Sequence, residues 1–251
     1  MKVLQGTGDD LADSGDLKDS KSFWLVKLLT KTQSLIQTLP TQLQLLHRTS
    51  QSITNPLFRF LEREVTVASQ LLDTVRNDLL QLKEMCKGER KSTNVLKQLA
   101  QELHADLIPK KWRRFNIANI TATEWLEDFK KRIEQLAKVS STTDYGKRGL
   151  WFGGLLFPEA FMTATRQSIA QDNKWSLEEL ELKFEVDPSD EAIKTNDLGF
   201  IVEGLSIEGA SYARDEQRIK LSEALSSFLP RANLKWVNKA KAAQEEGGES
   251  I

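Results

Sequence analysis

The sequence predicts an α+β protein: a helical N-terminal half with one long helix, then a mixed subdomain of helices and an incomplete antiparallel β-barrel-like sheet. Two observations lead to this prediction. Apolar residues recur at helical spacing through the first half, and their period changes to two after about residue 180. We expect four zones, namely an acidic flexible linker at 1–22, a helical subdomain at 23–108, an α+β partial-barrel subdomain at 109–238 and a polar tail at 239–251.

The helical zone is dominated by a long helix predicted over about 56–87. Asn55 suits its N-cap, Pro56 suits its first turn and Gly88 suits its end. At 1.5 Å per residue such a helix is roughly 45 Å long, more than a compact domain of this size needs. We therefore expect it to reach across a larger assembly. Its apolar stripe consists of Leu57, Phe60, Leu61, Val67, Leu71, Val75, Leu79 and Leu82.

The third zone contains two capping boxes, Thr121 with Glu124 at the start of a helix and Ser176 with Glu179 on a short turn. Pro158 begins another helix. The glycines just before it are expected to permit close packing rather than anion binding, because only apolar residues follow them. The large apolar residues that we expect in the core or at an interface are Phe60, Leu71, Trp125, Phe157, Phe161 and Trp175.

Alternation of apolar and charged residues predicts the strands. Leu182, Phe184 and Val186 alternate with charged residues, so this strand is expected to be half buried. Gly204 is a candidate bulge between two later strands. A barrel needs more strands than these to remove its edges, so we expect a chain that ends before its closing strands and leaves the last strand as an exposed edge. The later strands are expected at about 200–202, 205–207 and 234–237.

Composition narrows the class of protein. The formal net charge of −1 gives no overall field that would recruit nucleic acid or an anionic membrane. Cys86 is the single cysteine, which excludes an internal disulfide and fits a reducing compartment. No apolar run approaches the roughly 20 residues that cross a bilayer, and the N-terminal segment lacks the apolar core of a signal peptide. We expect a cytoplasmic protein with neither a membrane nor a nucleic acid as its partner.

The sequence contains no recognisable catalytic motif. It has no phosphate-binding loop and no nucleophile elbow. His47 and His104 are the only histidines and lie far apart, which argues against a metal site. Cys86 follows an apolar helix and is expected to be an incidental or buried thiol. The protein is therefore predicted to be no enzyme and to bind no cofactor or metal.

A cluster of basic and aromatic residues at 110–115 carries the remaining hypotheses. Stacking aromatics with cations can bind single-stranded nucleic acid. The structural alternative places Trp112 in the core and leaves the cations in solvent, and the neutral overall charge favours it. Docking on an acidic protein surface is a third reading. The candidate docking residues are Lys110, Lys111, Trp112, Arg113 and Arg114.

Several runs of the sequence resemble the C-terminal domain of dynein heavy chains, particularly the cytoplasmic type. The most specific are GGLLFPEAFMTATRQ at 153–167 and WSLEEL at 175–180. Axonemal dyneins are similar but usually lack the second run in this form. Supporting runs are NPLFRFLEREV at 55–65, PKKW at 109–112 and LKWV at 234–237. The likeness extends from about residue 35 to residue 237.

This resemblance implies a non-catalytic cap that lies on the AAA+ ring of the same heavy chain and modulates minus-end-directed movement on microtubules. It implies ATP and Mg²⁺ in the ring rather than in these 251 residues. The implied partners of the parent complex are the intermediate, light intermediate and light chains. The implied location is the cytoplasm and its microtubule cytoskeleton. Two alternatives stay open, a free-standing helical scaffold or adaptor and an axonemal or intraflagellar dynein.

Overall fold

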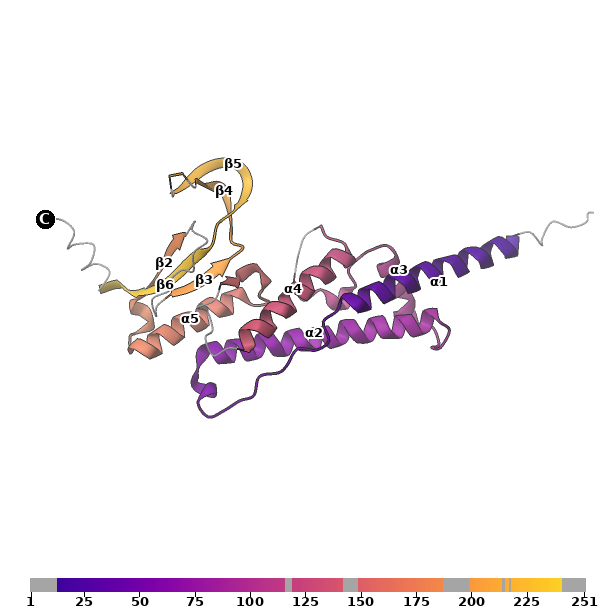
Figure 1. The fold of residues 1–251 in the computed structure, drawn as a ribbon, viewed down its shortest axis with the longest axis horizontal. Helices are drawn as coiled ribbons and strands as arrows, with labels where there is room; N and C mark the ends of the chain where they lie inside the picture. The colour runs from indigo at the N-terminus through magenta and orange to yellow at the C-terminus, as the bar shows by residue number, and fades with distance from the viewer. Residues whose placement is uncertain are drawn as a thin grey trace, which may run out of the picture. The chain divides into compact units, whose positions relative to one another are not determined.

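The computed structural model describes residues 13–115, 119–141, 149–186, 199–213, 215–216 and 218–240 of the 251-residue protein (Figure 1). It forms two compact units. The first unit contains residues 1–41 and 71–130, and the second contains residues 42–70 and 131–251. Two helices, α2 (Pro56–Cys86) and α4 (Ala122–Ser140), contribute residues to both units.

The first unit is helical. Its buried side chains come from the apolar faces of its helices and include Leu28, Leu79, Leu103 and Trp125, each at most 1% exposed. The elements are α1 (Asp13–Thr38), the C-terminal part of α2, α3 (Asn94–His104), the short 3₁₀ helix η2 (Lys110–Trp112) and the N-terminal part of α4.

Local signals place the helix ends well. Asn55 accepts a hydrogen bond from the amide of Phe58 (3.1 Å), and Pro56 is the first residue of α2, as predicted. Helix α1, in contrast, begins at Asp13, inside the segment expected to be a linker. The helical zone was expected to begin at 23, because the polar turns before it contain no apolar period. Residues 1–12 and the tail from residue 241 lie outside the described part.

The second unit combines α-helical segments with two sheets. Helix α5 (Pro158–Asn173), the N-terminal part of α2 and the C-terminal part of α4 supply the α-helices. The first sheet has the order β1-β3-β6-β2, with β1 parallel to β3 and the other pairs antiparallel; β4 and β5 form a separate antiparallel pair (Figure 1). The strands are β1 (Leu150–Trp151), β2 (Leu180–Val186), β3 (Gly199–Glu203), β4 (Ser206–Ala213), β5 (Arg218–Phe228) and β6 (Ala232–Asn238).

The α+β class is confirmed, but the β-barrel-like description is too specific. The described strands form two separate sheets and no closed barrel. Strand β6 was expected to be an exposed edge, yet it lies between β3 and β2. The edge strands of this sheet are β1 and β2, and on β2 Leu182 and Phe184 are 37% and 39% exposed rather than buried. A two-residue period predicts that a segment is a strand, but it does not predict which distant strand will pair with it.

Glycines at two positions have structural roles that differ from the predicted bulge. Gly204 has a φ of +74° and joins β3 to β4, while the irregularity in the pairing of β4 with β5 falls at Gly209, with a φ of +66°. A Cβ on Gly154 would lie 2.3 Å from Cε3 of Trp151. This confirms that the glycines before α5 permit close packing.

Candidate interaction surfaces

The predicted basic segment is anchored in the first unit by Trp112. This side chain is fully buried, and its indole Nε1–H donates a 3.0 Å hydrogen bond to Oδ2 of Asp78 on α2. Its ring stacks on Trp125 with centroids 5.7 Å apart, and Trp125 stacks in turn on Phe115 and Phe129 at 5.2 and 5.1 Å. An indole enclosed in this way is unavailable to stack on a nucleic-acid base.

The four cations of the segment are exposed. Lys111 lies 3.9 Å from Oδ1 of Asp78, a loose ion pair. Arg113 donates two hydrogen bonds, of 3.1 and 3.0 Å, to the carbonyl oxygen of Ile108, which fixes its side chain against the backbone. Lys110 and Arg114 are exposed in the same segment. The structure therefore brings one buried aromatic anchor and a small basic surface together.

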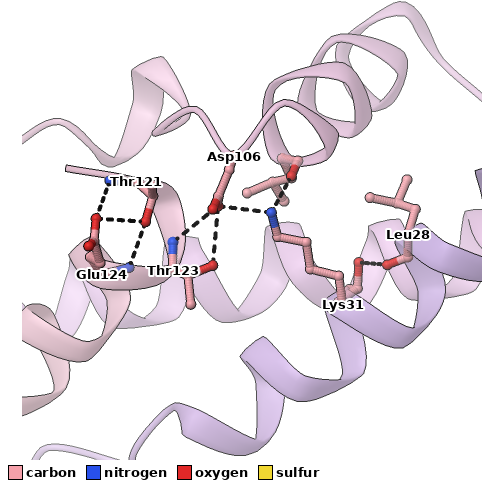
Figure 2. Close-up of polar contacts among 8 residues, drawn as sticks. Leu28, Lys31, Asp106, Thr121, Thr123 and Glu124 are labelled. Carbon is pink, nitrogen blue, oxygen red and sulfur yellow. Dashed lines mark hydrogen bonds and ion pairs between the residues drawn. The ribbon is translucent and has the colours of Figure 1, made fainter. Parts of the chain in front are cut away.

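Asp106 holds the stretch that leads from α3 to α4 (Figure 2). Its backbone is left-handed, with a φ of 56°, just after the end of α3. Its Oδ1 accepts hydrogen bonds from Nζ of Lys31 (2.8 Å) and from the amide and hydroxyl of Thr123 (3.3 and 3.1 Å). Burial raises the pKa of Asp106, but these hydrogen bonds and the Lys31 charge outweigh it, so its pKa lies below the ordinary value.

The predicted capping box beside this junction is also present (Figure 2). The amide of Glu124 donates to Oγ1 of Thr121 (3.2 Å), and the amide of Thr121 donates to Oε2 of Glu124 (2.8 Å). The basic segment is thus held by buried Trp112 and, on its N-terminal side, follows the end of α3 that Asp106 fixes. A segment held in this way can present its cations without first becoming ordered.

The other candidate core or interface residues divide into two groups. Phe60, Leu71, Trp125 and Phe161 are buried, at 6%, 3%, 1% and 3% exposure, and therefore act as core residues of their units. Phe60 and Phe161 meet edge to face with centroids 5.5 Å apart. The half-buried members, which retain an accessible surface, are Phe157 and Trp175.

A groove runs between α2 and α5 in the second unit. It has a volume of about 800 Å³, and its lining extends beyond the two helices to Trp175 and Leu177. Arg59 and Arg63 lie on the α2 side, and the guanidinium of Arg63 sits 4.3 Å from the centroid of the Phe157 ring. Sequence reasoning missed this groove, although Arg59 and Arg63 are one helical turn apart on the same face.

A buried carboxylate, also missed from the sequence, fixes the start of α5. Glu64 is fully buried and accepts hydrogen bonds from the amides of Leu156 (3.0 Å) and Phe157 (2.6 Å). Burial raises its pKa more than these amides, Arg132 and Arg63 lower it. Arg132 in turn donates to the carbonyl oxygen of Gly153 at 2.7 Å. The polar groups before α5 are thereby satisfied inside the core.

The hairpin of β4 and β5 exposes an apolar row. Ile219, Leu221 and Leu225 of β5 are 48%, 95% and 94% exposed. Alternate residues of a strand lie on one face, so Ile219 and Leu221 share a face of β5, whereas the irregular pairing between Leu221 and Ser226 interrupts the alternation before Leu225. The sequence contained this signal, since Lys220 and Ser222 separate the apolar residues at the start of the strand. Large apolar side chains exposed on one hairpin are candidates for an interaction site.

The described residues contain no group of three or more His, Cys, Asp and Glu side chains that could hold a metal ion. Cys86 is half-buried, and burial raises the pKa of its thiol, which disfavours the reactive thiolate. Within the same described ranges, no helix has the length and apolarity to span a membrane.

Comparison with known proteins gives the family. The family model for the C-terminal domain of the dynein heavy chain matches residues 2–250. The protein is 42% identical over 219 residues to a cytoplasmic dynein heavy chain of Paramecium tetraurelia, and 40% identical over 229 residues to that of Drosophila melanogaster. These alignments cover 87% and 88% of the present sequence but 5% of each relative. A flagellar outer-arm dynein alpha chain of Chlamydomonas reinhardtii is 26% identical over 61% of the sequence and 4% of the relative. The protein therefore belongs to the family of C-terminal domains of dynein heavy chains.

Proposed function

We propose that this protein is the non-catalytic C-terminal module of a cytoplasmic dynein heavy chain, which packs on the AAA+ motor ring and modulates ATP-driven movement along microtubules. In this proposal ATP and Mg²⁺ bind in the ring, and the module itself binds neither. Its location is the cytoplasm, on microtubules, together with the intermediate, light intermediate and light chains of the complex.

The exposed apolar row on β5 carries this proposal. Ile219, Leu221 and Leu225 are too exposed to stabilise the hairpin, and a folded module gains stability by covering such a row. The sequence spans only 5% of the cytoplasmic dynein relatives that it matches, so the proposed parent polypeptide offers a large protein surface. A docked position on that surface would bury the row.

The basic segment is the second contact in the proposal. Lys110 and Arg114 are exposed, and Trp112 holds the segment in a fixed position. Contacts with acidic ring residues would bias the ring only if they differ between its conformational states. Such couplings are typically about 1–3 kcal/mol, which is enough to change kinetics several-fold without abolishing the chemistry.

The cytoplasmic class is supported by the order of similarity. The cytoplasmic heavy chains of Paramecium and Drosophila are 42% and 40% identical over most of the sequence, whereas the flagellar alpha chain is 26% identical over a shorter part. The WSLEEL run at 175–180 points the same way. Both observations support the cytoplasmic class in this proposal over the axonemal alternative.

Single-molecule motility and bulk ATPase of the full heavy chain test the proposal. Charge reversal by Lys110→Glu with Arg114→Glu should alter run length or stall force and leave ATP hydrolysis within roughly tenfold of the unmodified motor. Lys91→Glu with Lys97→Glu, also exposed and in the first unit, is the matched control and should change neither. Unchanged motility in the first variant would remove the basic segment from the mechanism. Abolished hydrolysis would show that the module does more than bias the ring.

A second variant tests the apolar row. Leu221→Ser with Leu225→Ser removes apolar surface that is solvent-exposed in the isolated module, so the free module should lose little stability. In the full motor the same change should loosen docking and make the hairpin more accessible to limited proteolysis. Equal proteolysis of the variant and unmodified motors would mean that the row is not covered there.

A further inference from the structure

We propose that the groove between α2 and α5 binds an acidic amphipathic helix from the part of the heavy chain outside these 251 residues. The inference rests on the proposed docking of this module within its own heavy chain, and it adds the chemistry of one contact. It concerns the second unit and is separate from the basic segment of the first.

Charge identifies the partner. Arg59 and Arg63 line the α2 side, both exposed, and the described lining of the groove includes no acidic residue. Neither arginine forms an ion pair within the described ranges, and Arg63 contacts the ring of Phe157 instead. Two cations one helical turn apart match two carboxylates spaced one turn apart on another helix.

Shape points to a helix rather than a loop. Along the α5 side, Ala160 and Ala164 are small residues one turn apart, and Thr163 and Gln167 repeat the same spacing beside them. Small side chains let a second helix approach closely. Thr163 and Gln167 can form hydrogen bonds with the polar side chains of that helix. Phe60 is buried and adds apolar contact to the lining. A bound amphipathic helix would set its own apolar anchors against this lining and its charged rim against the arginines.

The groove is preformed. Lys174 adopts a left-handed φ of 57°, and the amide of Trp175 donates to the carbonyl oxygen of Ala170 at 2.9 Å, which fixes the end of α5. Trp236 of β6 donates from Nε1 to Oγ1 of Thr165 at 3.0 Å, which ties α5 to the sheet. A partner helix would therefore bind without the cost of ordering its site.

Size points to a segment of the same polypeptide. A groove of about 800 Å³ lies within the range of sites for small ligands, so it would hold only a short stretch of helix. Tethering within one polypeptide raises the effective concentration of a segment, commonly to the millimolar range. A groove with low affinity for that segment can therefore stay occupied. The matched part is 5% of each cytoplasmic relative, so nearly all of such a heavy chain lies outside it and supplies many candidate helices.

Site-specific photo-crosslinking in the full heavy chain tests the inference. A photoreactive residue at Gln167, which lines the groove, should form an adduct with an acidic helix of the same heavy chain outside this module, identified by peptide mapping. Arg59→Glu with Arg63→Glu should lower the adduct yield roughly tenfold, the change expected when two moderate charge pairs are lost. Lys91→Glu with Lys97→Glu should leave the yield unchanged. Arg59→Gln with Arg63→Gln should give an intermediate yield, because it removes attraction without adding repulsion.

Three outcomes would overturn the inference: an adduct on a separate polypeptide, an adduct on a segment without acidic residues, or a yield that the arginine reversals leave unchanged. The result is separable from that of the motility test. An acidic-helix adduct together with unchanged motility on reversal of Lys110 and Arg114 would keep the groove and refute modulation by the basic segment. Altered motility without the adduct would keep the proposed function and refute the groove.

Discussion

The indole of Trp112 on η2 is hydrogen-bonded to the carboxylate of Asp78 on α2, with 3.0 Å between Nε1 and Oδ2. This bond joins two segments 34 residues apart and gives a buried polar N–H its acceptor. Trp112 is therefore a core anchor, and any docking by its neighbours depends on the position that Asp78 gives it.

Removal of that acceptor should destabilise the protein. Asp78→Leu leaves the Trp112 N–H buried and unpaired, which should cost about 1–3 kcal/mol in the free energy of unfolding, measured by urea titration. Asp78→Asn keeps an acceptor oxygen and should cost less. Asn77→Ala, at an exposed neighbouring position, should stay within about 0.5 kcal/mol. A loss as large for Asp78→Asn as for Asp78→Leu would assign the effect to charge rather than to the hydrogen bond.

The long helix offers a matched comparison of two leucines. Leu71 is 3% exposed and Leu80 is 40% exposed, and both belong to α2. Leu71→Ala should lower the free energy of unfolding by about 2–5 kcal/mol through lost burial and a residual cavity. Leu80→Ala should cost far less, since Ala is also a better helix former. Similar losses at the two positions would mean that the buried face of α2 has been misassigned.

The sequence predicted the parts of the fold that depend on neighbouring residues. Asn55 with Pro56 and Thr121 with Glu124 are found as the expected helix starts, because capping is a contact between residues a few positions apart. Contacts between distant residues were not predictable in this way. The place of β6 between β3 and β2 depends on partners that no local period identifies.

The candidate surfaces show the same division. The basic cluster was visible as a run of residues, and the burial of Trp112 agrees with the structural reading of it. The groove was not visible, because its walls are α2 and α5, which are far apart in sequence. The sequence did not single out Glu64, because its hydrogen-bond partners lie 92 and 93 residues further along the sequence.

Close packing at the loop before α5 predicts a sharp difference between two adjacent glycines. A Cβ on Gly154 would lie 2.3 Å from a ring carbon of Trp151, whereas the nearest atom to a Cβ on Gly153 is 3.2 Å away. Gly154→Ala should therefore cost about 1–3 kcal/mol by overpacking, and Gly153→Ala should cost less. Thermal unfolding of both variants measures the difference. If Gly154→Ala were harmless, Trp151 would have to move freely in the folded protein.

The buried carboxylate of Glu64 predicts a pH dependence with a definite sign. Burial raises its folded-state pKa above the ordinary value of 4.5, despite the amides of Leu156 and Phe157 and the charges of Arg132 and Arg63. The folded protein therefore holds this proton more tightly than the unfolded protein. The stability linked to it is fully present below pH 4.5 and is lost as the pH rises through the folded-state pKa.

The variant that isolates this effect is Glu64→Gln, which does not titrate. Its amide nitrogen cannot accept a hydrogen bond, so one of the two backbone amides loses its partner at a cost of about 1–3 kcal/mol. The difference in the free energy of unfolding between the unmodified protein and this variant should be largest at and below pH 4.5 and should narrow as the pH rises above it. Exposed Glu127→Gln is the control and should differ from the unmodified protein by less than about 0.5 kcal/mol at each pH. Urea titrations in a series of buffers measure both differences. A gap that widens with rising pH would show that the two amides and Arg132 stabilise the ionised carboxylate more than burial disfavours it.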